Sequence, residues 1–547
     1  MPQTLKSIFL VSICALPLIS GQRIKAADPA EDEQRLKKDL GGADAERILE
    51  YLRGQMLTEA SKQKLSQLIE EMGSANFKKR QEATRKLVEA GPVAIPLLRA
   101  ATSHRDKEIA SRARRCINEI QNGPRADLPM VAIRQLTRLK HEKSVDVLLA
   151  FLPAVSDEPL HDEIMEALAK LGVAGKTVNP AIKKALDDPL LRPAAVQLLL
   201  QADDPEMSKK LHTYLKDKDP SVRFHVAMHF LKKNDREAVP VLIGLIGESP
   251  SGVIWQQCEE ALYALAGELA PAVETKSGTM EDRKEASQQW AAWWKAKGDQ
   301  VLFGQKDEPP TDHCIVSETG QTNRVFEWRP EGKPRFDLTD LTSPVDARIL
   351  PGRRVLVAEQ QGRRVSERSF SGKLLWEQTF DDGPISVQRL PSGNTFVATM
   401  QRVVEVTRDG QMVYSHAVDA GSYISDANRL TDGRICLVTT DGKVIFMNAA
   451  GKEIKTVTLD SQGAIDAGPN GHVLVSQAGT GRIVEFDAKG DKVMDLKIEG
   501  AWMGARLPDG NILVASKTKR KMIKIDRTGK VIWEKDIDAY PHSIHWK

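Results

Sequence analysis

The stretch GARLPDGNILVASKTKRKMIKIDRTGKVIWEKDIDAYPHS, residues 504–543, decides the fold of the C-terminal half. It contains two glycine turns, one ending at Gly510 and one at Gly529, and short apolar segments between them. Both turns recur upstream at intervals of about 40 residues, typical of propeller repeats. The first set comprises Gly352, Gly393, Gly433, Gly471 and Gly510, and the second comprises Gly332, Gly372, Gly410, Gly451, Gly490 and Gly529. With four strand-like segments per unit, this period predicts an all-β propeller of six blades over residues 312–547.

The last residues of the chain are expected to close this propeller. The first unit, residues 312–345, contains only three strand-like segments. The segment from Ser543 to Trp546 is in register with the segment that begins each other unit. An unclosed ring would leave open strand edges, which natural β proteins avoid. We therefore predict that the C-terminal strand completes the first blade.

The repeats resemble known propeller families across residues 312–547. Two units carry the glycine-to-tryptophan spacing of PQQ-type blades, Gly372 to Trp376 and Gly529 to Trp533. On these features the segment resembles the PQQ-like and NHL-like propellers, and to a lesser extent the arylsulfotransferase type. The resemblance implies the fold and not an activity. With only two such tryptophans, no cofactor is expected.

The N-terminal half has the periodicity of paired helices. The segment DPSVRFHVAMHFLKKNDREAVPVLIGLI, residues 219–246, alternates two apolar helix patterns around an Asn-Asp break, and its Asp-Pro start suits a helix N-terminus. It resembles a HEAT repeat, and NFKKRQEATRKLVEAGPVAIPLLRAAT, residues 76–102, resembles the repeat type of exported bacterial proteins. We therefore expect a HEAT-type α-solenoid over residues 45–300, a linker over 301–311, and a multidomain chain overall. Trp290, Trp293 and Trp294 lie on the last predicted helix of the solenoid, and we expect their rings to be part of the hydrophobic core.

The N-terminus is typical of an export signal. Lys6 precedes an apolar run from Ile8 to Ile19, and small residues follow it. This pattern predicts a signal peptide over residues 1–27, with a disordered leader over 28–44. The apolar run is shorter than the about 20 residues that span a membrane. The protein is therefore expected to be secreted or periplasmic, without a membrane span.

Composition and cysteine spacing exclude several kinds of site. The chain has 547 residues, with 78 basic and 75 acidic side chains and a net charge of +3, so nucleic-acid binding is not expected. Cys116, Cys258, Cys314 and Cys436 form no CxxC pair, which argues against zinc ribbons and attached haem and predicts four free, mostly buried thiols. His225 and His229 have a metal-compatible spacing, but no third ligand accompanies them, so no metal is predicted there.

One face of the propeller carries the candidate ligand site. The residues that open the innermost strands are expected to form a column around the channel, and this column includes Asp346, Asp426 and Asp466. Three carboxylates at one channel mouth could hold calcium or a cationic ligand. Alternatively, they accept backbone hydrogen bonds. The residues expected beside them are Tyr423, Trp502, Tyr540 and His542, with a basic rim of Arg363, Arg364, Arg402, Arg482, Lys519 and Arg520.

Two functions fit these features. The first is a non-enzymatic scaffold, with protein binding by the solenoid and protein or small-ligand binding on the propeller. No GxSxG, HExxH or P-loop motif is present in the sequence. The alternative is a propeller enzyme, similar to lactonases, lyases or sulfotransferases. In that case His542 and the three aspartates would supply acid–base or metal chemistry at the channel mouth.

Overall fold

The computed structural model describes residues 29–56, 59–122, 127–155, 158–202, 204–274, 278–304, 313–320, 322–418, 421–468 and 471–546. The predicted signal peptide and most of the predicted linker lie outside these residues. The described chain separates into two compact units, the first ending at His229 and the second beginning at Phe230. No helix among the described residues is both long and apolar enough to cross a membrane.

The first unit consists of short helices packed through apolar faces, together with a two-stranded sheet of β1 (Val173–Ala174) and β2 (Thr177–Val178). Each helix is capped or stopped by local signals; Asn76, for example, accepts hydrogen bonds from the backbone N–H groups of Lys78 and Lys79 at the start of α4. The helices are α1 (Pro29–Leu40), α2 (Ala45–Gly54), α3 (Glu59–Glu71), α4 (Phe77–Ala90), α5 (Ile95–Ala101), α6 (Lys107–Asn122), α7 (Leu128–Leu139), α8 (Ser144–Phe151), α9 (Glu158–Gly172), α10 (Pro180–Lys184), α11 (Arg192–Gln201) and α12 (Pro205–His212), with α13 (Pro220–Lys232) running into the second unit.

Helix α1 replaces part of the predicted disordered leader. Leu36 is fully buried, and Asp32 is almost fully buried. The carboxylate of Asp32 accepts hydrogen bonds of 2.8 Å from both Arg134 and Arg138 of α7. The prediction of a disordered leader was wrong for this segment. Its own composition is polar, but ion pairs with residues about a hundred positions away hold it in place as a helix.

The second unit begins with three helices, α14 (Ala238–Glu248), α15 (Gly252–Ala266) and α16 (Met280–Lys297). Their core is aromatic: Trp290 is fully buried, with its ring centre 4.8 Å from that of Tyr263 and 5.2 Å from that of Trp293. These helices belong to the same compact unit as the propeller. The structural boundary therefore differs from the boundary predicted near residue 300.

The rest of the second unit is a propeller of six four-stranded antiparallel blades. Blade one is β26 (Pro541–Trp546), β3 (Cys314–Glu318), β4 (Arg324–Trp328) and β5 (Asp337–Leu338); blade two is β6 (Pro344–Leu350), β7 (Arg354–Glu359), β8 (Arg364–Ser369) and β9 (Leu374–Thr379); blade three is β10 (Pro384–Arg389), β11 (Thr395–Thr399), β12 (Arg402–Val406) and β13 (Met412–Ala417). Blade four is β14 (Ile424–Arg429), β15 (Ile435–Thr439), β16 (Lys443–Met447) and β17 (Glu453–Thr458); blade five is β18 (Gly463–Ala467), β19 (Val473–Gln477), β20 (Arg482–Phe486) and β21 (Lys492–Lys497); blade six is β22 (Met503–Arg506), β23 (Ile512–Ser516), β24 (Lys521–Ile525) and β25 (Val531–Asp536).

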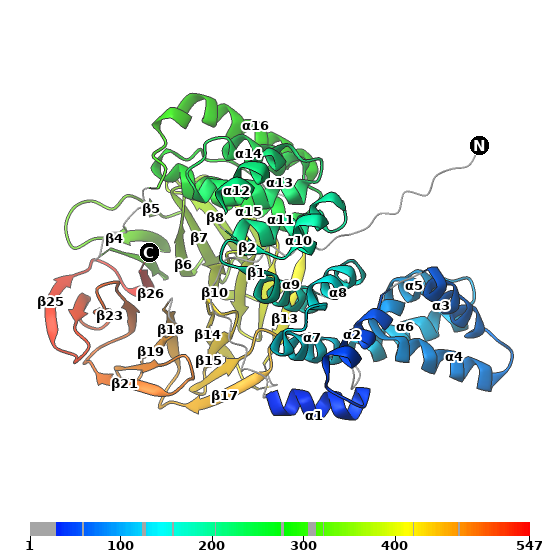
Figure 1. The fold of residues 1–547 in the computed structure, drawn as a ribbon. Helices are drawn as coiled ribbons and strands as arrows, with labels where there is room; N and C mark the ends of the chain where they lie inside the picture. Colours follow the sequence, from blue (N-terminus) through cyan, green and yellow to red (C-terminus); the bar gives the residue numbers. More distant parts are fainter. Residues whose placement is uncertain are drawn as a thin grey trace. The chain divides into compact units, whose positions relative to one another are not determined.

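The C-terminal strand completes blade one, as the register of the repeats predicts. Trp546 pairs with Cys314, and Ile544 pairs with Val316. The second strand of each blade is buried along its whole length, because neighbouring blades cover both of its faces. Figure 1 shows the helices α14–α16 next to the strands β7 and β8. Cys116, Cys258, Cys314 and Cys436 are all free and buried, as predicted.

Candidate binding site

The strand register changes the predicted column of channel residues. Asp346 pairs with Ala358 and Asp426 pairs with Val438, each partner being the penultimate residue of its second strand. In blade five that level belongs to Ala464, whereas Asp466 lies two residues further along β18, about 6.6 Å away. Asp426 is eight residues before Arg434, whereas Asp466 is six residues before His472, the residue equivalent to Arg434, so equal sequence spacing of the aspartates does not give equal height. The structure therefore places two aspartates at one level and not three.

Each of these aspartates joins one blade to the next. Oδ2 of Asp346 accepts a 2.9 Å hydrogen bond from the backbone N–H of Val387. Oδ2 of Asp426 accepts one of 2.7 Å from Ile465, and Oδ2 of Asp466 accepts one of 2.6 Å from Arg506. The donors lie on innermost strands, whose channel-side edges have no partner strand. The carboxylates thus satisfy backbone groups that would otherwise be unpaired.

Two neighbouring carboxylates in this layer have opposite pKa shifts. Burial opposes ionisation of Asp346, but the positive charges of His545 and Arg348 outweigh it and lower its pKa to about 2. Burial raises the pKa of Asp426 to about 6, and the negative charge of Asp346 adds to this effect. The channel therefore contains one permanently ionised carboxylate and one that titrates near neutral pH.

His545 is a channel residue that the sequence did not single out. Its Nε2 lies 2.6 Å from Oδ1 of Asp346, and only 2% of the residue is exposed. Arg348 donates across the channel to the carbonyl of Val387 and to Oδ1 of Asn428, over 3.3 and 3.4 Å. Polar side chains thus fill this layer. An Asp–His pair can move protons, but these groups are too deeply buried to contact a substrate in this conformation.

The channel aspartates, which the sequence analysis considered as possible calcium ligands, already have other partners. Oδ1 of Asp346 contacts His545 and its Oδ2 accepts from Val387. Both oxygens of Asp426 accept backbone N–H groups. Calcium needs six to eight oxygen ligands with free lone pairs. Across the described residues, no group of three or more His, Cys, Asp or Glu side chains is arranged to hold a metal.

The structure brings two of the predicted aromatic and imidazole residues, Trp502 and His542, together between blades six and one. Nε1 of Trp502 donates a 3.3 Å hydrogen bond to the carbonyl of His542. The ammonium of Lys517 lies 4.4 Å from the centre of the Trp502 ring. Two residues before His542, Tyr540 is 49% exposed. Burial lowers the pKa of His542, and the nearby charge of Lys517 lowers it further.

The other predicted members of this face are arranged differently. Tyr423 is exposed on blade four, away from this group along the ring. Most of the basic rim is paired with acids: Arg364 with Glu359 and Glu377, Arg402 with Asp381, Arg482 with Asp460 and Asp495, Lys519 with Glu499, and Arg520 with Asp538. Trp502, Lys517, Tyr540 and His542 lie near the junction of blades six and one and are called the aromatic–basic group below; Tyr540 is the exposed member, and the other three are partly buried.

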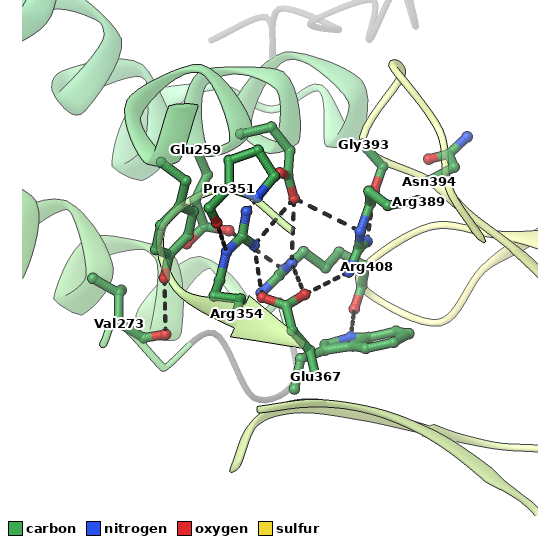
Figure 2. Close-up of polar contacts among 12 residues, drawn as sticks. Glu259, Val273, Pro351, Arg354, Glu367, Arg389, Gly393, Asn394 and Arg408 are labelled. Carbon is green, nitrogen blue, oxygen red and sulfur yellow. Dashed lines mark hydrogen bonds and ion pairs between the residues drawn. The ribbon is translucent and has the colours of Figure 1, made fainter. Parts of the chain in front are cut away.

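A second polar cluster lies at the opposite ends of the strands, between α15 and blades two and three (Figure 2). The carboxylate of Glu367 in β8 accepts hydrogen bonds from three guanidinium groups: from Arg354 Nη1 at 2.6 Å, from Arg389 Nη2 at 2.5 Å and from Arg408 Nη1 at 2.7 Å. These charges are almost completely buried. Three guanidinium groups around one carboxylate leave excess positive charge, which must be balanced from outside the blades.

Helix α15 supplies that balance. Oε2 of Glu260 accepts a 2.7 Å hydrogen bond from Arg354 Nη2. Glu259 lies 3.3 Å from Nε of Arg408, and burial raises its pKa. Burial opposes ionisation of Glu260, but Arg354 and Arg389 outweigh it and lower its pKa. This cluster was not predicted from the sequence. A Glu or another polar residue nevertheless recurs at the fourth position of the third strand in most blades.

Comparisons with known proteins support the architecture and do not identify an activity. HEAT repeats match residues 178–263, and no curated protein matches the chain. The propeller is similar to a catalytically inactive virginiamycin B lyase from Staphylococcus aureus with quinupristin, at 13% identity and a TM-score of 0.35 over 42% of this chain and 86% of that one.

Two further structures give similar values. BamB from Moraxella catarrhalis is 13% identical, with a TM-score of 0.28 over 42% of this chain and 71% of that one. A protein of unknown function from Bacteroides caccae is 15% identical, with a TM-score of 0.28 over 42% and 73%. Similarity at this level says nothing about activity. The chain combines HEAT repeats in its helical N-terminal region with a C-terminal six-bladed β-propeller.

Proposed function

We propose that this protein is an exported, non-enzymatic binding or scaffold protein. Its propeller would bind a protein segment or small ligand at the aromatic–basic group, and its helical repeats would bind a second protein. A HEAT-repeat region followed by a propeller is consistent with such a role.

One observation carries the proposal for the propeller. The channel carboxylates are occupied by backbone N–H groups of neighbouring blades. On the same face, Tyr540 is exposed, and Trp502 is only partly buried beside Lys517. Aromatic rings next to a cation are suited to binding a partner that carries both apolar and acidic groups.

A capture experiment tests this proposal. The full-length protein and the double variant Trp502→Ala/Tyr540→Ala would be compared for crosslinked partners in the cells that produce them. Ile454→Ala, an exposed apolar residue on the outermost strand of blade four, is the matched control. We expect at least one partner that the control retains and the double variant loses. An identical set of partners for all three proteins would contradict a site at the aromatic–basic group.

Export has its own test. The basic residue Lys6 and the apolar run after it support a cleaved signal, with the mature chain beginning between residues 22 and 28. N-terminal sequencing of the protein recovered from the periplasm or the medium would locate the cleavage. A cytoplasmic protein that retains residue 1 would contradict export.

A propeller enzyme is the second candidate. The observation that favours it is the 2.6 Å pair of His545 and Asp346, and because this pair is buried, catalysis would require the channel layer to open and admit the substrate. An enzyme of this kind would turn over a lactone or a sulfate ester, and His545→Gln would abolish turnover while partner capture persisted. No turnover by the wild-type protein in such a screen would count against it.

A further inference from the structure

The cluster that holds α15 has a counterpart three blades away. In blades two and three its members are Arg354 at the start of the second strand, Glu367 in the third strand, Arg389 at the end of the next innermost strand, and Arg408 two residues before a turn glycine. The same four positions in blades five and six are occupied by His472, Glu485, Arg506 and Arg527. We call these four residues the second socket.

Two of the three contacts to the central glutamate recur in the second socket, whereas Arg527 donates to the carbonyl of Gly510 and not to Glu485 as Arg408 does to Glu367. Arg389 pairs with Glu367 across the junction of blades two and three, and Arg506 pairs with Glu485 across the junction of blades five and six. Arg354 contacts Glu367, and in the same way Nδ1 of His472 lies 3.2 Å from Glu485. At the other four junctions, all within the described residues, at least two of these positions hold apolar or uncharged side chains.

The first cluster is covered by this chain's own helix. Glu260 of α15 lies 2.7 Å from Arg354, 3.7 Å from Arg389 and 3.8 Å from Arg408. The helix also packs on two turn glycines. A Cβ at Gly352 would lie 2.4 Å from the ring of Tyr263, and one at Gly393 would lie 2.7 Å from Cβ of Gln256.

The second socket has turn glycines at the matching places, and within the described part of the propeller unit no helix packs on them. Gly471 and Gly510 occupy the places of Gly352 and Gly393, and a Cβ at either would meet only side chains of the propeller itself. A cavity of about 320 Å³ opens here, lined by His472, Glu485, Val493, Met494 and Arg527. Val493 is 53% exposed beside it. The opening thus combines basic side chains with an apolar border.

We propose that the second socket binds a helix of a partner protein that presents a glutamate or aspartate flanked by apolar residues. Arg506 and His472 contact Glu485, and Arg527 lines the same cavity, so a carboxylate from a partner would complement the basic side chains there, as Glu260 does in the first cluster. The exposed Val493 and the glycine turns match the apolar packing that α15 makes on blades two and three. The α15 helix of the same chain is already bound at its own cluster, so the occupant proposed here is a helix of another protein.

A peptide that copies α15 tests the proposal. The probe is residues 252–266 with Cys258→Ser, held helical by a side-chain lactam, and binding to the full-length protein is followed by fluorescence anisotropy. We expect saturable binding that weakens at least tenfold when the peptide carries Glu260→Gln or when the protein carries Arg527→Glu. Lys535→Ala, another exposed basic residue of blade six, is the control and should bind like the wild type.

Other results of the binding and sedimentation experiments would overturn the proposal in whole or in part. No binding, or binding that Arg527→Glu leaves unchanged in a variant with an unaltered melting temperature, would overturn it. Concentration-dependent dimers that Arg527→Glu abolishes in sedimentation would identify the occupant as a second copy and overturn the claim of a different partner. Trp502→Ala should bind the peptide normally, because the aromatic–basic group lies at the other ends of the strands.

Discussion

At the scale of single residues, the number and sign of neighbouring charges decide how a buried carboxylate behaves. Glu367 and Asp426 both lie inside the propeller with little exposure. Burial opposes ionisation of Glu367, but Arg354, Arg408 and Arg389 outweigh it and lower its pKa. For Asp426, burial raises the pKa, and the negative charge of Asp346 raises it further. The two residues therefore predict different responses to mutation.

Glu367→Gln should destabilise the second unit strongly. The change removes the charge shared by three buried arginines, and breaking a buried ion pair in this way costs about 3–5 kcal/mol. Glu405→Gln is the matched control, because Glu405 holds the same strand position in blade three and faces a single arginine, Arg429, at 4.0 Å. It should cost about 1 kcal/mol. Urea unfolding of both variants measures the difference, and equal costs would contradict the role given to the three arginines.

Asp426→Asn should change the pH dependence of stability. An acid whose pKa is higher in the folded state than in the unfolded state contributes stability at low pH and loses it as pH rises through the folded value. With a folded pKa of about 6 and an unfolded value of roughly 3.9, Asp426 should cost about 1.4 kcal/mol more at pH 8 than at pH 5. The free energy of unfolding of the wild type relative to Asp426→Asn should therefore fall by that amount between pH 5 and pH 8. A difference that is independent of pH would show that Asp426 is ionised throughout.

At the scale of elements, β26 joins the last segment of the chain to the first blade. Ile544 is buried in the core between blades six and one, and His545 balances Asp346. Deleting residues 541–547 removes the inner strand of blade one and leaves Asp346 without that partner. We expect the second unit to unfold at a much lower temperature, and Ile544→Ala alone should cost about 2–5 kcal/mol. Ile454→Ala, at an exposed position, should cost less than about 0.5 kcal/mol. A deletion variant that melts like the parent would contradict the closure.

Some of these elements could be predicted from the sequence, and others could not. Glycine turns at a regular spacing and buried second strands are local signals, so the six blades and their closure could be read from the chain. The level of Asp466 was predicted wrongly, because Asp426 and Asp466 are 40 residues apart whereas Gly433 and Gly471 are 38 apart, which places Asp466 two residues nearer its turn. The cluster around Glu367 was missed because its partners come from three separate elements, one of them α15. The order of α1 was missed because it depends on Arg134 and Arg138.

At the scale of the whole molecule, the helices after residue 230 are part of the propeller unit and not only of the helical repeats. The HEAT match to residues 178–263 spans the boundary at His229 and ends within α15. The HEAT sequence pattern marks helices that pair with one another. The assignment of α15 to the propeller unit reflects instead its contacts with the blades, where Glu259 and Glu260 face buried arginines. A chain of similar helix pairs can thus change its packing partner without a change in its sequence pattern.

A fragment of residues 233–547 should therefore fold, whereas a fragment of residues 313–547, cut at the predicted linker, should be much less stable. The shorter fragment keeps Arg354, Arg389 and Arg408 around Glu367 but loses Glu260, which lies 2.7 Å from Arg354. Leaving buried charge unbalanced costs about 3–5 kcal/mol, which lowers the melting temperature of a domain of this size by roughly 10 °C. Thermal melts followed by circular dichroism compare the two fragments. Glu260→Gln in the longer fragment should reproduce part of the loss, because it keeps α15 in place and removes only its charge. Equal melting temperatures for the two fragments would show that the propeller does not need the charges of α15.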